Sequence, residues 1–71
     1  VFDKPDYREL FEAVMRLDKA KRLAVVLYYA EGYSIKEISE ILGVPAGTVG
    51  TRLARARAEL KQNLKEEESN E

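Results

Sequence analysis

A helix-start signal and a helix-stop signal lie close together in the middle of the chain, and a proline follows. Ser34 and Glu37 have the spacing of a capping box, in which each side chain accepts a hydrogen bond from the other residue's backbone N–H. Gly43 suits the left-handed residue that ends a helix, and Pro45 suits the first turn of the next one, where no N–H is needed. The sequence therefore predicts a short helix, a turn of about three residues and a second helix.

Helix packing must stabilise this chain, because it lacks the usual cross-links of small domains. It has 71 residues, with no Cys and no His. Disulfides, the usual zinc sites and Ser or Cys nucleophiles activated by His are therefore excluded. We find no catalytic constellation and expect no enzymatic activity, no metal and no cofactor. No apolar run approaches the roughly 20 residues that span a bilayer, so we expect no membrane partner.

Apolar residues recur at helical spacing in four segments, whereas the alternation and hairpin turns of strands are absent. Asp18 is placed to cap the second segment and Gly32 to end it. These patterns predict an all-α domain of four helices without a wing, in which the third and fourth form a C-terminal helix-turn-helix and Leu53 is buried between them. The four stripes are Tyr7, Leu10, Phe11, Val14 and Met15; Leu23, Val26, Leu27 and Ala30; Ile35, Ile38, Ile41 and Leu42; and Val49, Leu53, Ala56, Leu60 and Leu64.

The outward side of the fourth segment combines small residues with threonines and arginines, although the net charge of the whole chain is −1. No acid occurs on this segment before Glu59. Small side chains allow close approach to DNA, and Thr and Arg reach base edges or phosphates in a major groove. Lys36, in the first turn of the preceding helix, fits a phosphate contact or an ordinary surface lysine. A solvated helix face and an ordinary helical hairpin are the alternatives to DNA binding.

Four stretches of the chain together resemble one family. They are residues 27–34 (LYYAEGYS), 37–45 (EISEILGVP), 47–49 (GTV) and 52–57 (RLARAR). With these stretches, residues 17–64 resemble region four, the C-terminal promoter-binding domain of bacterial sigma factors, and most of all the extracytoplasmic-function group. On this basis residues 1–65 are predicted to be one helix-turn-helix DNA-binding domain, and residues 66–71 an acidic, disordered tail.

The resemblance implies that the fourth helix reads the −35 element of duplex promoter DNA during transcription initiation. The positions that match the family's DNA contacts are Thr48, Thr51, Arg52 and Arg55, to which Lys36 is added from the residues themselves. Gly50 stands where the family usually has Lys or Arg, and Ala54 where a larger side chain is common. We therefore expect base contacts from Thr51 and Arg55, and backbone contacts from Thr48 and Arg52.

In this family the first two helices grip the β flap of the RNA polymerase core, and anti-sigma factors often mask the same surfaces. The predicted partner surface consists of Phe11, Val14, Val25, Tyr28 and Tyr29, for which complete burial in the core is the alternative. The resemblance also implies a cytoplasmic, nucleoid-associated protein. Two other functions stay open from the sequence. One is the output domain of a different transcription regulator, and the other is a helical protein-interaction module that has lost DNA binding.

Overall fold

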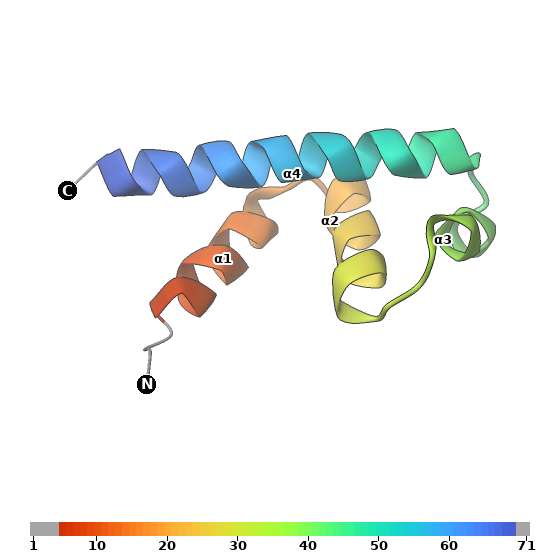
Figure 1. Ribbon diagram of the computed structural model, residues 1–71, viewed down its shortest axis with the longest axis horizontal. Helices are drawn as coiled ribbons and strands as arrows, with labels where there is room; N and C mark the ends of the chain where they lie inside the picture. Colours follow the sequence, from red (N-terminus) through yellow and green to blue (C-terminus); the bar gives the residue numbers. More distant parts are fainter. Residues whose placement is uncertain (1–4, 70–71) are drawn as a thin grey trace.

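One long helix, α4 (Ala46–Ser69), extends along the molecule, and the other helices lie on one side of it (Figure 1). The structure, a computed structural model, describes residues 5–69. Before α4 come α1 (Pro5–Arg16), α2 (Lys19–Val25), the π-helical turn η1 (Val26–Ala30), which continues α2 directly, and α3 (Ile35–Leu42). Residues 5–69 contain no strand. The predicted all-α domain with a helix-turn-helix is confirmed, with α2 and η1 together as its second helix.

The helix boundaries depend on the side chains that the sequence pattern singled out. Asp18 Oδ1 accepts a hydrogen bond from the backbone N–H of Lys21 at 2.9 Å, which caps α2. The Ser34 hydroxyl accepts one from the Glu37 N–H at 3.0 Å, and a Glu37 carboxylate oxygen accepts one from the Ser34 N–H at 2.9 Å. Gly43 ends α3 with a φ of 70°. Because these caps satisfy backbone groups that the helices leave unpaired, they fix where each helix begins and ends.

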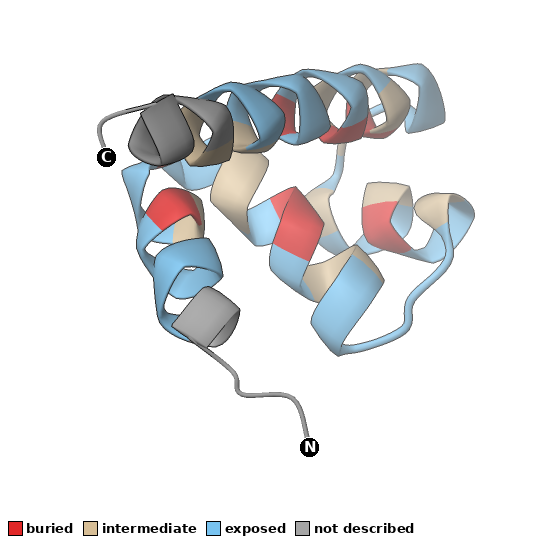
Figure 2. Ribbon diagram, turned by 60° about the vertical axis from the view of Figure 1, so that its left-hand side comes forward, coloured by how far each residue is buried: buried red, intermediate tan, exposed pale blue. Residues whose placement is uncertain are grey.

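The core lies between α4 and the three segments that pack against it. α1, α2 and α3 each contact α4, and the buried positions of α4 face them in Figure 2. Leu53 is 2% exposed, as predicted from the stripe on the fourth helix. Among the side chains that the structure describes, those of residues 8–64, the buried ones are Ala13, Leu17, Ala24, Val25, Ile38, Val49, Leu53 and Ala56.

The predicted stripe of the second helix is buried only in part: Leu27 packs against the core, but the other three residues of the stripe are exposed. Ala24 and Val25 are buried, whereas Leu23 and Val26 of the predicted stripe are 40% and 37% exposed, and Ala30 is exposed as well. This helix is apolar over more than half of its circumference, so its periodicity did not single out one face. The π-helical turn then changes the phase, because it holds more residues per turn than an α-helix.

The first helix contacts the core through fewer residues than its apolar stripe predicts. Ala13 is buried and Val14 half-buried, while Leu10, Phe11 and Met15 are exposed. Tyr7 belongs to the same predicted stripe, but its side chain lies outside the described ones. The disordered tail expected over residues 66–71 stays a prediction: the backbone of α4 is helical to Ser69, and residues 70–71 lie outside the described residues.

Candidate nucleic-acid interface

The turn between α3 and α4 holds the two helices so that one side of α4 remains uncovered. The backbone N–H groups of Gly43 and Val44 both donate to the Ser39 carbonyl, at 2.9 and 3.1 Å. Pro45 directly precedes α4, and its carbonyl accepts a hydrogen bond from the Thr48 N–H at 3.0 Å. Since the opposite side of α4 is buried against α3, the turn directs the remaining side toward solvent.

This solvent-facing side of α4 forms a shallow depression, and four of its six lining residues are predicted DNA contacts. We call it the α4 face; it is lined by Pro45, Gly47, Thr48, Thr51, Arg52 and Arg55. Thr48 and Arg52 are half-buried, whereas Thr51 and Arg55 are exposed. The lining offers hydroxyl and guanidinium donors and contains no carboxylate. Such a surface is suited to phosphate oxygens and to the acceptors of the major groove.

Two further positions on or beside the outward side of α4, Gly50 and Ala54, carry no side chain or only a methyl group. Ala54 is exposed. A Cβ atom built on Gly50 would meet no atom outside its own helix backbone within 4 Å, so the fold does not require glycine there. Lys36 is exposed in the first turn of α3, and it does not line the depression. The structure therefore gathers Thr48, Thr51, Arg52 and Arg55 in one depression, and leaves Lys36 outside it on α3.

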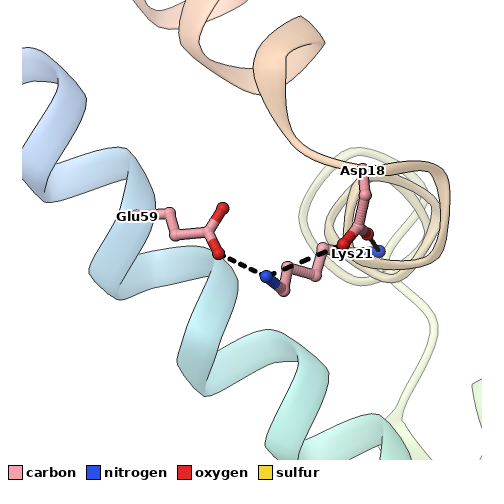
Figure 3. A network of polar contacts seen from close by, with 3 residues as sticks. All are labelled: Asp18, Lys21 and Glu59. Atoms are coloured by element: carbon pink, nitrogen blue, oxygen red, sulfur yellow. Dashed lines mark hydrogen bonds and ion pairs between the residues drawn. The ribbon is translucent and has the colours of Figure 1, made fainter.

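A cross-helix ion pair next to the α4 face had no signal in the sequence. The Lys21 ammonium of α2 bonds the Glu59 carboxylate of α4, and it lies 3.7 Å from Asp18 Oδ2 (Figure 3). The hydrogen bond to Glu59 is the main cause that raises the pKa of Lys21 above its usual value. The two charges are 38 positions apart in the chain, so only the packing of α2 on α4 brings them together.

The predicted partner surface is split between accessible and buried residues. Phe11 and Tyr29 are 64% and 56% exposed, and Val14 and Tyr28 are half-buried, but Val25 is only 7% exposed and belongs to the core. The rings of Tyr28 and Tyr29 meet edge to face, with centroids 4.9 Å apart. Val25 therefore cannot serve as an exposed docking residue.

Two adjoining apolar grooves run between α1 and the second helix. Leu10, Val14 and Val26 line both of them. The grooves together extend the predicted partner surface to residues that the sequence pattern had assigned to the core. We call them the α1–η1 groove; its other lining residues are Phe11, Met15, Arg22, Val25, Tyr29, Ala30, Arg57 and Leu60.

Other kinds of site find no support in the part of the chain that the structure describes. No group of three or more Asp, Glu, His or Cys side chains there could hold a metal ion. Within the same residues, no helix has the length and apolar character required to cross a membrane.

Comparison with known proteins decides the family. Residues 5–60 match the family described as "Sigma-70, region 4". The chain belongs to this family. It is 50% identical over 52 residues to the ECF RNA polymerase sigma factor SigM of Mycobacterium tuberculosis (strain H37Rv), covering 73% of this chain and 26% of that protein. With SigW of Bacillus subtilis, another ECF RNA polymerase sigma factor, the identity is 38% over 55 residues, covering 78% of this chain and 29% of the relative.

A third relative is a sigma factor whose name does not carry the ECF designation. The RNA polymerase sigma factor FliA of Pseudomonas aeruginosa is 36% identical over 55 residues, covering 78% of this chain and 22% of FliA. The region-four chain thus spans about a quarter of the length of the curated relatives it matches. The resemblance to the extracytoplasmic-function sigma factors, drawn above from four short stretches, is confirmed.

Proposed function

We propose that this region-four domain recognises the −35 element of duplex promoter DNA as part of an RNA polymerase sigma factor, without catalysis. The observation that carries the proposal is the α4 face, where Thr48, Thr51, Arg52 and Arg55 line one depression free of carboxylates. Membership of the sigma-70 region-four family supports the same function. A sigma factor acts on the chromosome, so we place the protein in the cytoplasm, associated with the nucleoid.

The α4 face divides by exposure into two groups of DNA contacts. Thr51 and Arg55 are exposed, so they can reach base edges in the major groove. Thr48 and Arg52 are half-buried, so their polar ends suit the phosphates beside the groove. Lys36 on α3 is the proposed contact to the phosphate backbone, which the first helix of a helix-turn-helix crosses.

Selection from a pool of duplexes with a randomised segment tests this function. The chain should enrich one short sequence, and Thr51→Ala should relax the preference at a single position of that sequence. Arg52→Gln should lower the slope of log affinity against log salt by about one, since it removes the cation proposed to contact phosphate. Salt-dependent binding with no enriched sequence would contradict promoter reading.

The α1–η1 groove is the proposed binding site for protein partners. A sigma factor must attach to the RNA polymerase core, and exposed apolar side chains such as Phe11 and Met15 offer a surface for this contact. We assign the groove to the β flap of the core, and to an anti-sigma factor that would compete for it. Residues 1–65 form the proposed binding domain, with residues 66–71 as an acidic tail.

A further inference from the structure

Lys21 connects α2 to the end of the α4 face through its ion pair with Glu59 (Figure 3). The Lys21 side chain is 20% exposed and the Glu59 side chain 46%, so the pair lies at the protein surface. Asp18 Oδ2 lies 3.7 Å from the same ammonium. The lysine is therefore bonded to one carboxylate on α4 and close to another at the start of its own helix.

Glu59 continues the row of side chains that forms the α4 face. At 100° per residue, Thr48, Arg52, Arg55 and Glu59 fall on one stripe of the helix, three or four positions apart. Glu59 is the first acid on α4, one turn beyond Arg55. The Arg55 guanidinium is near enough to Lys21 to act on the pKa of its ammonium and lower it, against the larger effect of Glu59. The ion pair thus lies at the C-terminal end of the α4 face.

A carboxylate at this end would face DNA phosphate. When the N-terminal part of a helix lies in the major groove, its later turns leave the groove past the sugar-phosphate backbone. A bare Glu59 would repel the phosphates there, and at about 0.1 M salt this repulsion extends over roughly 10 Å. The Lys21 ammonium neutralises the negative charge of this carboxylate at close range.

We propose that Lys21 is a further determinant of DNA affinity, which acts by neutralising Glu59 at the end of the α4 face. This inference rests on the proposed function, since it requires that DNA lies along that face. It adds α2 to the DNA-binding machinery of the helix-turn-helix, although α2 is not part of that motif. Lys21 and Glu59 together set how closely the DNA backbone can approach the C-terminal end of the α4 face.

The proposal requires opposite effects from the two members of the pair. Removing Lys21 leaves Glu59 charged and facing phosphate, so DNA binding should weaken. Removing the charge of Glu59 removes its repulsion of phosphate and leaves Asp18 as the acidic neighbour of Lys21, so binding should become tighter. A pair that only holds α2 against α4 would behave differently, because losing either member would weaken the fold, and with it DNA binding, in the same direction.

The test measures fluorescence anisotropy of a random-sequence duplex with the chain at low and high salt. Lys21→Gln should weaken binding about threefold at low salt and Glu59→Gln should strengthen it by a similar factor, the change expected for one phosphate contact. The double variant should return close to wild type. Lys61→Gln is the matched control, since Lys61 is exposed on another side of α4 and its loss should change the affinity less than that of Lys21.

Thermal unfolding of each variant separates binding from folding, and Arg55→Gln separates the two proposals. Weaker binding by both Lys21→Gln and Glu59→Gln, or no change in either folded variant, would overturn the role of Lys21. If Arg55→Gln still weakens binding in that case, the proposed function stands and the further inference alone fails. If Arg55→Gln has no effect, DNA does not lie along the α4 face, and both proposals fail.

Discussion

Arg57 Nη1 on α4 donates a hydrogen bond to the Tyr29 hydroxyl in η1 at 3.1 Å. Both side chains are exposed and both line the α1–η1 groove. The two residues are 28 positions apart in the chain, so no local pattern in the sequence pairs them. The hydrogen bond directs Arg57 toward the α1–η1 groove and away from Arg55 and the α4 face.

Arg57→Gln should therefore leave DNA binding nearly unchanged. Its guanidinium points toward Tyr29, so its loss should change the slope of log affinity against log salt by much less than one, whereas Arg52→Gln should change it by about one. Anisotropy titrations of both variants over a series of salt concentrations give the two slopes. Equal slope changes for Arg52 and Arg57 would place both arginines on DNA.

Phe11→Ser should weaken binding to the RNA polymerase core without lowering the stability of the domain. The Phe11 side chain is 64% exposed on α1, so little of its area contributes to the fold, whereas a partner seated in the α1–η1 groove would bury it. Co-purification with the core enzyme gives the binding, and thermal unfolding gives the stability. Ile41→Ser is the control, because Ile41 is 52% exposed on α3 and outside the groove. Equal binding by the Phe11 and Ile41 variants would contradict the assigned surface.

Leu53→Ala should destabilise the domain by about 2–5 kcal/mol, because it removes a buried side chain and leaves a cavity between α4 and its neighbours. Leu53 is 2% exposed, whereas Leu23 is 40% exposed. Leu23→Ala should therefore lower the free energy of unfolding by clearly less than Leu53→Ala. Urea denaturation followed by circular dichroism measures both, and a domain this small can unfold altogether with the first substitution. Equal losses would mean that Leu53 is not a core residue.

Gly50→Lys should stabilise α4 and strengthen DNA binding at low salt. A lysine has a higher helix propensity than glycine, by up to about 1 kcal/mol, and the built Cβ has open space around it. The added ammonium also offers about one phosphate contact, which salt screens, so the gain in affinity should shrink as salt rises. Weaker binding by the lysine variant at low salt would instead show that DNA approaches the backbone at Gly50 too closely for a side chain.

Acid should remove the stabilising effect of Asp18. The hydrogen bond from the Lys21 backbone N–H, as the largest cause, holds the pKa of this carboxyl below its ordinary value of 3.8. When folding lowers the pKa of a carboxyl, the charged group stabilises the fold at pH values above its pKa in the unfolded chain. This stabilisation is lost as the pH falls through the pKa of the folded state. The melting temperature of wild type should exceed that of Asp18→Asn at neutral pH, and the difference should shrink below about pH 4. A difference that is constant with pH would contradict this role.

The local signals in the sequence were sufficient for the helix boundaries and for the core of the helix-turn-helix. Ser34, Glu37 and Gly43 act on backbone groups within a few residues, so their effect does not depend on the rest of the fold. Val49 and Leu53 follow one narrow stripe on a helix whose other side is polar, which left a single choice of buried face. The position of the α4 face could be predicted from the same stripe, because this face lies on the opposite side of the helix.

The tertiary structure alone decided which side of the second helix is buried and which charges meet. Ala24 and Val25 enter the core in place of Leu23 and Val26, because a helix that is apolar over most of its surface is oriented only by its neighbours. The Lys21–Glu59 ion pair likewise depends on where α2 crosses α4. Periodicity fixes the faces of one helix, but contacts between distant helices follow from how their surfaces pack together, which no local pattern encodes.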